Sequence, residues 1–479
     1  MKPSQLLRFY KAGSTSGWRL TPEMVKKISH YAQFPATGVS LRQMVQFGDN
    51  PSAGNLFRAS QFIVEELPIR LAHRVKDLEA LPNGLSEMPS IQRVRDWYSQ
   101  SFEELTAIPI PKLSKEIKDA LYHHQGKENI KMVLPLSNNG ESNGHGNGNG
   151  NGKSKGKSVM ALKSEPGQQG QINPSLEDWK AEGFQEDIKT SHGHRRYFAS
   201  VDPNIVQWPI EIENYNEQVT KALQKIKTRH DGVVSTVAQG VLEWKESRPN
   251  IDVDYSLQTF LDRFYMSRIG IRMLIGQHIA LNLDRGIRPD YVGIICTDTN
   301  IRDIAQSAVD NARFICEDWY GLYEAPQVDI VCNPDISFMY VPGHLSHMIF
   351  EVVKNSLRAV VELYGVDSDS YPPVKVIVAQ GQQDITIKIS DEGGGIPRSE
   401  VPYVWTYMYT TAKNTPHLDL DLSKSDFKAP LAGFGYGLPI SRLYSRYFGG
   451  DLKLISMEGY GTDVYLHLNR LSSSSEPLP

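Results

Sequence analysis

The chain has 479 residues, of which 40% are hydrophobic and 22% charged, as in globular proteins of about two or three domains. Its net charge of −4 gives no reason to expect nucleic acid as a partner, and no run of about eighteen apolar residues could span a membrane. The three cysteines contain no CxxC pair, which favours reduced thiols over a disulfide framework or a metal site.

The N-terminal half is predicted to be helical. Residues 1–20 are basic and contain neither Asp nor Glu, which is compatible with a mitochondrial presequence or with a flexible N-terminus. Over residues 21–288 apolar residues recur with helical spacing, interrupted by an insertion. In ELPIRLAHRVKDLEALP the stripe consists of Leu67, Leu71, Val75 and Leu78. This pattern predicts a four-helix-type bundle.

A region at about 109–214 has a different composition. It contains the tract SNNGESNGHGNGNGNGKSKGKS, which is too polar to bury a core, so we predict a largely disordered insertion. The tract contains GKS twice, but the glycine that a phosphate-binding loop needs five residues earlier is Asn in both cases, and no strand precedes it.

The segment 289–470 alternates between short β-type runs and helical stretches. Strands are expected at 291–296, 328–332, 374–380 and 384–390, helices at 301–319 and 344–364, and a final hairpin at 451–469. This order predicts an α/β sandwich with a mixed sheet, so the whole chain is expected to be α+β. Residues 471–479 are expected to form a flexible tail.

One predicted helix, GHLSHMIFEVVKNSLRAVVELYG at 343–365, carries polar groups along one face. Opposite the apolar stripe of Leu345, Ile349, Val352 and Val360 lies a polar stripe of His347, Glu351, Asn355, Arg358 and Glu362. A charged stripe alone usually faces solvent. Asn is unfavourable inside a helix, however, and an Asn one turn after a Glu offers Mg²⁺ a neutral oxygen beside a carboxylate that could act as a base.

Glycine-rich motifs follow this helix in a fixed order. Asp391 ends a predicted strand and begins DEGGGIP, GFGYGLPIS precedes a helical stretch, and GYGT precedes the last strand. Bare backbone amides and a helix N-terminus are suited to binding a polyphosphate. Any one of these motifs is weak evidence, but the ordered set is specific.

The ordered set resembles the N, G1, G2 and G3 boxes of the GHKL ATPase superfamily. Most of the chain outside the insertion is similar to the mitochondrial protein kinase family within it, on segments that include LDRFYMSRIGIRMLIGQHIAL and HMIFEVVKNSLRAVVE. The resemblance implies a homodimeric serine kinase of the mitochondrial matrix. Such a kinase uses ATP and Mg²⁺ to phosphorylate the α subunit of the pyruvate dehydrogenase decarboxylase component, and it binds the lipoyl domain of the acetyltransferase core.

The resemblance also implies roles for individual residues. Glu351 would be the general base, His347 would orient it, Asn355 would hold Mg²⁺, and Asp391 would accept a hydrogen bond from adenine. Residues 410–432 would form a mobile lid. The expected nucleotide-binding residues are Glu351, Asn355, Arg358, Asp391, Gly393, Gly395, Thr410, Thr411, Gly433, Phe434, Gly435, Tyr436, Gly437, Leu438 and Thr462.

Two further sites are implied in the helical domain. An effector pocket for pyruvate-like acids would use Lys227, His230, Arg268 and Arg272, although Lys227 stands where the family usually has Arg and lacks its planar fork for a carboxylate. A lipoyl pocket would use Phe34 and Phe47. The Asp-Trp tail of animal members is missing, since no Trp follows Trp405.

Three alternatives stay open at this stage. The first is a kinase for the branched-chain 2-oxoacid dehydrogenase, although the bundle motifs RFYMSRIGIRML and RHDGVVSTVAQGV favour the pyruvate substrate. The second is a histidine kinase, because His230 precedes an acid on a predicted helix. The third is an ATP-binding scaffold without catalysis, against which the intact Glu351 argues.

Overall fold

The computed structural model describes residues 18–48, 52–122, 208–247, 255–284, 288–410, 435–471, 474, 476 and 477. The chain divides into two compact units, residues 112–206 and the remainder. In the smaller unit the described residues include helix α6, Lys115–Tyr122. All other described helices and strands belong to the larger unit.

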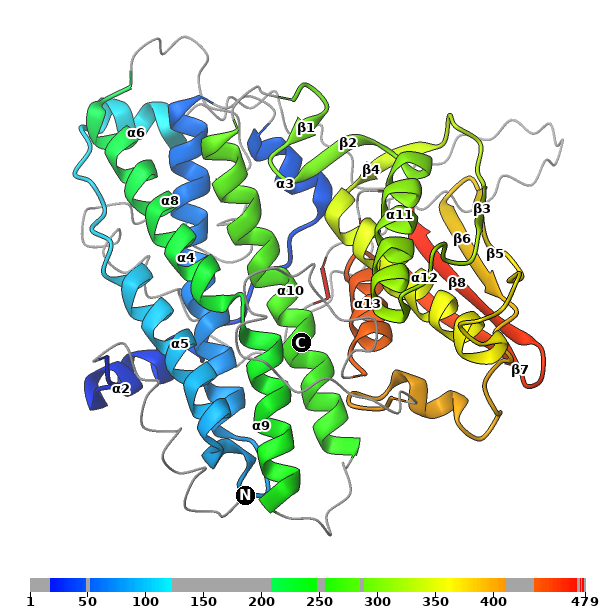
Figure 1. The fold of residues 1–479 in the computed structure, drawn as a ribbon. Coiled ribbons are helices and arrows are strands. Elements are labelled where there is room, and N and C mark those ends of the chain that lie inside the picture. The colour runs from blue at the N-terminus through cyan, green and yellow to red at the C-terminus, as the bar shows by residue number, and fades with distance from the viewer. Residues whose placement is uncertain are drawn as a thin grey trace, which may run out of the picture. The chain divides into compact units, whose positions relative to one another are not determined.

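Helices dominate the first half of the larger unit (Figure 1). They are α2 (Pro22–Tyr31), α3 (Leu41–Gly48), α4 (Ala53–Glu79), η1 (Leu85–Glu87), α5 (Pro89–Thr106), α8 (Ile210–His230), α9 (Val233–Ser247) and α10 (Tyr255–Leu283). Helix α4 packs on α5, α8 and α10, and α8 also packs on α5 and α10, which confirms the predicted four-helix bundle. Helix α8 begins inside the range predicted as an insertion, of which residues 123–207 lie outside the described part of the chain.

The bundle is held together by the stripes that the sequence predicts. On α4, Leu67, Leu71, Val75 and Leu78 are each at most 1% exposed. The N-terminal ends of α2 and α4 are capped by the hydroxyls of Thr21 and Ser52, which accept hydrogen bonds from the free backbone amides of the first turn. Burial of an apolar face, more than helix propensity, therefore determines where these helices lie.

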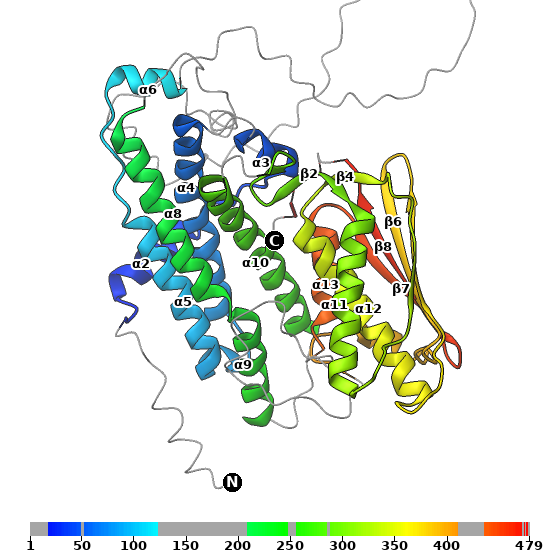
Figure 2. The ribbon, with the colours of Figure 1, turned by 45° about the horizontal axis from the view of Figure 1, so that its top comes forward.

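The second half is an α/β sandwich. Its elements are β1 (Tyr291–Val292), β2 (Ile295–Asn300), α11 (Ile301–Tyr320), β3 (Val328–Val331), β4 (Ser337–Tyr340), α12 (Pro342–Tyr364), β5 (Val374–Gln380), β6 (Asp384–Asp391), η4 (Val401–Trp405), α13 (Gly437–Tyr447), β7 (Asp451–Met457) and β8 (Gly461–Asn469). The main sheet has the order β3-β5-β6-β8-β7, with β3 parallel to β5 and the other pairs antiparallel. Helices α11, α12 and α13 cover one face of it (Figures 1 and 2), so the predicted mixed sheet is confirmed.

The single strand predicted at 291–296 is wrong. Gly293 has a positive φ of 65°, which turns the chain back so that β1 and β2 form a hairpin. The side-chain amide of Gln277 on α10 fills the turn, donating to the Val292 carbonyl at 2.9 Å and accepting from the Ile294 amide at 2.9 Å. Strand β4, which pairs with β2, was not predicted because its four residues are too short for a pattern.

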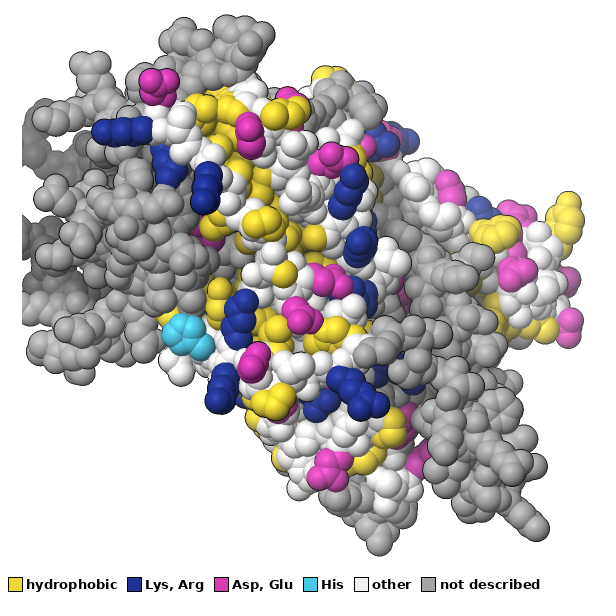
Figure 3. All heavy atoms as spheres, turned by 90° about the vertical axis from the view of Figure 1, so that its left-hand side faces the viewer, with side chains coloured by type: hydrophobic (Ala, Val, Ile, Leu, Met, Phe, Trp, Pro, Cys, Tyr) yellow, Lys and Arg dark blue, Asp and Glu magenta, His cyan; other side chains and the backbone are white. Residues whose placement is uncertain are grey.

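No helix in the described part of the chain is long and apolar enough to cross a bilayer. On the face shown in Figure 3, Lys, Arg, Asp and Glu side chains are interspersed with hydrophobic ones, without one large patch of a single kind.

Candidate active site

Helix α12 presents the polar stripe to the rest of the site. Its apolar side, Leu345, Ile349, Val352 and Val360, is at most 2% exposed and packs into the sandwich, as predicted. On the other side Glu351 is 5% exposed, His347, Asn355 and Arg358 are half-buried, and Glu362 is exposed. The middle of this stripe is therefore not an ordinary solvated face.

Glu351 is held by a buried lysine that the sequence analysis did not single out. The Nζ of Lys354 lies 2.9 Å from Oε1 and 2.8 Å from Oε2 of Glu351, and Lys354 is only 2% exposed. Burial alone would raise the pKa of Glu351, but the charges of Lys354 and His347 outweigh it and hold that pKa below its usual value. The carboxylate is therefore ionised and fixed in position.

Helix α13 begins directly against this carboxylate. A Cβ added to Gly437, the first residue of α13, would lie 2.2 Å from Oε2 of Glu351, so a larger residue there must displace that carboxylate or the start of α13. His347 meets the same helix, because its ring packs edge-on against Tyr444 with 5.2 Å between centroids. The predicted catalytic pair and the predicted phosphate-binding glycine thus lie together.

Asn355 stands one turn after Glu351, next to the predicted metal position. No group of three or more His, Cys, Asp or Glu residues that could hold a metal occurs in the described part of the chain. Mg²⁺ accepts waters and phosphate oxygens as most of its ligands, so a single amide oxygen from Asn355 fits a nucleotide-bound Mg²⁺. Arg358, one turn further on, pairs with Glu362 at 3.4 Å.

Asp391 ends β6 and points at α12. Its Oδ2 accepts a hydrogen bond from the Ser356 hydroxyl at 2.8 Å, and its Oδ1 accepts one from the Gly393 amide at 3.0 Å. Burial raises the pKa of Asp391, and the hydrogen bonds from Ser356 and Gly393 oppose that rise. These contacts fix the carboxylate that we expect to recognise adenine.

The glycines of the DEGGGIP loop are needed for contacts within the protein itself. A Cβ on Gly393 would lie 2.5 Å from the Cβ of Ala359 on α12, and one on Gly395, where φ is +69°, would lie 2.1 Å from the Met457 carbonyl. The loop is also bonded to the β7–β8 turn, since the Gly459 amide donates to the Gly394 carbonyl at 2.8 Å. Thr462 lies opposite Asp391 in the β6–β8 pairing, which brings the last glycine motif to the same place.

The segment expected to be a lid lies almost wholly outside the described residues, as do Thr411, Gly433 and Phe434. Its flanks are described, and Thr410 and Leu438 are half-buried. Gly435 has a φ of +77°, and a Cβ added to it would lie 2.2 Å from the carbonyl oxygen of Tyr409. Tyr407 and Tyr436, one on each side of the segment, pack with Tyr265 of α10 at centroid distances of 5.3 to 5.9 Å. Both flanks are therefore held against the helical bundle.

The predicted effector residues are only partly together. His230 is 1% exposed, its Nε2 lies 3.0 Å from the Ser101 hydroxyl, and burial together with nearby arginines lowers its pKa to about 3. Arg268 approaches the His230 carbonyl at 3.5 Å, and Arg272 pairs with Asp231 at 2.8 Å.

The fourth predicted effector residue, Lys227, is exposed on α8. The basic residue that reaches Ser101 is Arg229, which donates to that hydroxyl at 2.8 Å and pairs with Glu104 at 2.6 Å. Of the two lipoyl candidates, Phe34 is 5% exposed and packs edge-on against His30 at 5.3 Å. The side chain of Phe47 lies outside what the structure describes.

Three residues of the site region were missed by sequence reasoning. Lys354 and Ser356 flank Asn355 in the helix, and Arg229 precedes His230. A signal for Lys354 was available, because its position three residues after Glu351 is the spacing at which helical ion pairs form. Nothing in the sequence indicates that Ser356 reaches Asp391, because that contact depends on how α12 crosses β6.

We expect Ser356→Ala to weaken ATP binding by roughly tenfold, because a hydrogen bond to a charged group contributes about 1.5–3 kcal/mol. Without the hydroxyl, Asp391 would lose one of the contacts that orient it and its pKa would rise further. Titration calorimetry with ATP measures the change, with Ser370→Ala, an exposed serine, as the matched control. Equal affinities for the two variants would contradict this role.

Comparison with known proteins gives two consistent results. Residues 38–296 match the family described as mitochondrial branched-chain alpha-ketoacid dehydrogenase kinase, and residues 340–472 match the histidine kinase-, DNA gyrase B-, and HSP90-like ATPases. The chain is 46% identical to the mitochondrial pyruvate dehydrogenase (acetyl-transferring) kinase of Schizosaccharomyces pombe, over 95% of this chain and 98% of that protein.

Two other relatives carry similar names. The pyruvate dehydrogenase (acetyl-transferring) kinase of Arabidopsis thaliana is 39% identical over 95% of this chain and 96% of its own. Isozyme 3 from Homo sapiens is 34% identical over 96% of this chain and 90% of its own. The similarity therefore extends over nearly the full length of all three proteins.

Proposed function

Because the chain belongs to the family of mitochondrial 2-oxoacid dehydrogenase kinases, we propose that it phosphorylates and inactivates pyruvate dehydrogenase. The target would be a serine on the α subunit of the decarboxylase component, and the phosphate would come from ATP. The observation that supports this proposal best is the 46% identity, over nearly the whole length of both chains, to a kinase named for that substrate. The ATP-binding half is equally consistent with it, since residues 340–472 match GHKL-type ATPases.

The described residues suggest how such a transfer works. Phosphoryl transfer depends on positioning and charge neutralisation more than on covalent chemistry. Glu351, ionised and fixed by Lys354, would accept the proton of the substrate hydroxyl. Asp391 would hold adenine at one end of the site, and the amides at the start of α13 would face the phosphates at the other. Mg²⁺, held by Asn355, would supply neutralising charge when bound.

Lys354 should determine the pH range over which Glu351 works. Because the pKa of Glu351 is lowered in the folded chain, the ion pair stabilises the fold above the ordinary carboxyl range and is lost as pH falls through the lowered value. Lys354→Met removes the cation while burial remains, so the pKa of Glu351 should rise and the acidic limb of kcat/KM should move to higher pH.

The measurement is the pH profile of kcat/KM for wild type, Lys354→Met and Lys354→Arg. The arginine variant keeps the charge and should return the acidic limb towards the wild-type position. An acidic limb that stays in place in Lys354→Met would show that Lys354 does not govern the ionisation of Glu351.

The substrate can be tested directly against the branched-chain alternative. The matching family description mentions the branched-chain enzyme, whereas the full-length relatives are named for pyruvate dehydrogenase. Transfer of labelled γ-phosphate from Mg-ATP to both decarboxylase components, each with its lipoyl-bearing core, decides between them. We expect label on serine of the pyruvate component. Label on the branched-chain component alone would contradict the substrate assignment. ATP binding without phosphate transfer to either component would contradict the kinase assignment.

The histidine kinase alternative is disfavoured by the surroundings of His230. Its ring is buried, its centroid lies 4.6 Å from that of the tilted Tyr98 ring, and it is hydrogen-bonded to Ser101, so no phosphate donor reaches it without rearrangement of the bundle. The buried ion pair at Glu351 likewise argues against a scaffold without catalysis. We propose that His230, Arg268 and Arg272 belong to an effector site for small carboxylic acids, at whose edge Lys227 stays exposed.

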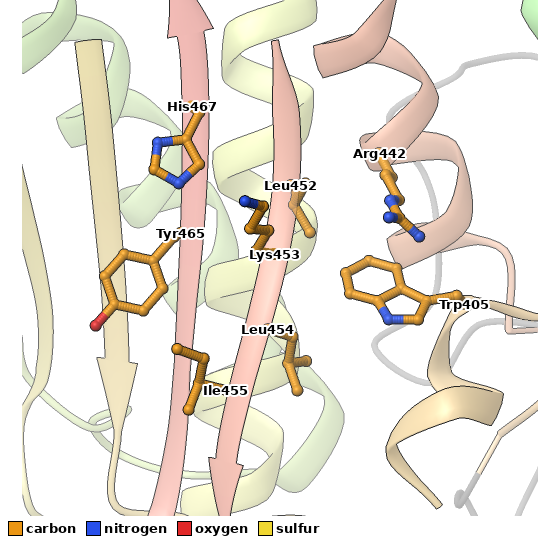
Figure 4. Close-up of a pocket in the computed structure, with 8 residues that line it drawn as sticks. All are labelled: Trp405, Arg442, Leu452, Lys453, Leu454, Ile455, Tyr465 and His467. Atoms are coloured by element: carbon orange, nitrogen blue, oxygen red, sulfur yellow. The ribbon is translucent and has the colours of Figure 1, made fainter. Parts of the chain in front are cut away.

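We also propose a homodimer formed through the last two strands. Strand β7 lies at the end of the sheet order, and its Ile455 and Met457 are 63% and 67% exposed. A pocket lies beside it, where the guanidinium of Arg442 stacks on the Trp405 ring at 4.6 Å (Figure 4). An open strand edge with exposed apolar side chains suits pairing with a second copy.

The remaining partners and the location follow from the family. The relatives are named as mitochondrial enzymes, and we propose the mitochondrial matrix as the site of action. The lipoyl domain of the acetyltransferase core would dock near Phe34 and Phe47.

A further inference from the structure

Glu476, near the C-terminal end of the chain, is buried. We expected residues 471–479 to form a flexible tail, yet Glu476 is only 5% exposed and its carboxylate is surrounded by donors. The tail is also tied to the sheet, because the Asn469 side-chain amide donates to the Ser474 hydroxyl at 2.6 Å. A glutamate among serines carries no sequence signal for burial, so this feature emerges only from the fold.

The helical bundle supplies the cation for Glu476. The Nη1 of Arg70 on α4 donates to Oε2 of Glu476 at 3.0 Å, and Nη2 contacts Oε1. Arg70 also binds Glu66 at 2.8 Å and the Thr37 carbonyl at 2.5 Å. The backbone of Val39 completes the contact, since its amide donates to Oε1 at 3.1 Å and its carbonyl accepts from the Glu476 amide at 3.3 Å.

The α/β sandwich supplies the remaining donor. The hydroxyl of Tyr447, the last residue of α13, donates to Oε2 of Glu476, and Tyr447 is 1% exposed. Burial and the charge of Glu476 raise the pKa of Tyr447 well above its usual value, so it stays a donor at neutral pH. Gly270 of α10 borders the cluster, where a Cβ would lie 2.9 Å from both Arg70 Nη1 and Glu476 Oε2.

These contacts connect two halves of the molecule through one side chain. Arg70, Val39 and Gly270 belong to the helical half, whereas Tyr447 ends the helix whose first residue, Gly437, packs on Glu351. The helix has 11 residues, so it spans roughly 16 Å and moves as one rigid piece. A shift at its C-terminal end is therefore passed on to Gly437.

We propose that Glu476 is a positioning residue for catalysis, which fixes α13 against the helical bundle and thereby sets the packing of Gly437 on Glu351. The inference rests on the proposed kinase function. Breaking the contact would leave the buried charges of Glu476 and Arg70 only partly paired, which is costly, so the intact contact is strongly favoured. Loss of the contact should lower kcat by a larger factor than it raises the KM for ATP, because Asp391 and its hydrogen bonds are not part of the cluster, whereas the start of α13 is displaced.

The test compares wild type, Glu476→Gln and Tyr447→Phe, with Glu458→Gln at an exposed position as the matched control. Spin labels on exposed residues Glu246 of α9 and Lys375 of β5 report the distance between the two halves. We expect a narrow distance distribution in wild type and control, and a broader one in both cluster variants. Phosphotransfer should fall by about tenfold or more in Glu476→Gln, the loss expected from breaking a hydrogen bond to a charged group.

Tyr447→Phe removes one neutral donor and should fold even if Glu476→Gln does not, so the comparison remains decisive. A kcat within twofold of wild type, or a reduced kcat with an unchanged distance distribution, would overturn the positioning role. If wild type itself transferred no phosphate, the proposed function would fail, while the distance distributions would still show whether Glu476 joins the two halves.

Discussion

Replacing Glu351 with glutamine should lower kcat for phosphotransfer by a factor of roughly 10²–10⁴, the usual contribution of a positioned general base. Glutamine has nearly the same shape but cannot accept the proton of the substrate hydroxyl. Asp391 and the glycine loops are unchanged, so ATP should still bind. Steady-state kinetics with the decarboxylase substrate, together with calorimetric ATP binding, measure the two effects separately.

The control for Glu351→Gln concerns stability. The substitution leaves Lys354 buried without its counter-ion, and breaking such a pair costs about 3–5 kcal/mol. In the double variant Glu351→Gln, Lys354→Met the unpaired charge is gone, so stability should recover while activity does not. Full phosphotransfer by the single variant would show that Glu351 is not the base, even with ATP binding intact.

Gly437→Ala should reduce phosphotransfer by about tenfold or more, because a single methyl group displaces the catalytic carboxylate. Its Cβ would lie 2.2 Å from Oε2 of Glu351, so either the carboxylate or the start of α13 must move. Overpacking of this kind costs about 1–3 kcal/mol. Kinetics and thermal unfolding of the purified variant measure both consequences.

Two further variants serve as controls for Gly437→Ala. Gly343 lies near the start of α12 with nothing within 4 Å of an added Cβ, so Gly343→Ala should leave activity unchanged. In the double variant Gly437→Ala, Glu351→Asp the carboxylate is one methylene shorter and withdraws from the new methyl group, so activity should partly return. Wild-type activity in Gly437→Ala alone would show that the contact with Glu351 is unimportant.

The sequence predicted those parts of the molecule that follow from local periodicity. The bundle stripe from Leu67 to Leu78 and the two faces of α12 have regular spacing, and both are found where predicted. The strands β3, β5, β6, β7 and β8 were predicted for the same reason, because apolar alternation is a local property. The hairpin at Gly293 was not, because its turn is stabilised by Gln277 from a distant helix.

At the candidate site, sequence order identified the boxes but not their mutual contacts. That Glu351, Asp391 and Gly437 approach one another was an expectation from resemblance. Ser356 reaches Asp391 across 35 residues of sequence, and Gly437 reaches Glu351 across a segment outside the described residues. Such contacts depend on how α12 crosses the sheet and α13, and a local sequence pattern carries no information about that crossing.

The contact between Val39 and Glu476 also has a consequence for the order of folding. These residues are 437 positions apart, so the contact closes almost the whole chain, and contacts of such long range form late. During synthesis α4 emerges early with Arg70 bound only to Glu66 and backbone, and its second carboxylate arrives 406 residues later. The helical half of the molecule is thus synthesised first, but its buried ion cluster is completed only when the last residues of the chain arrive.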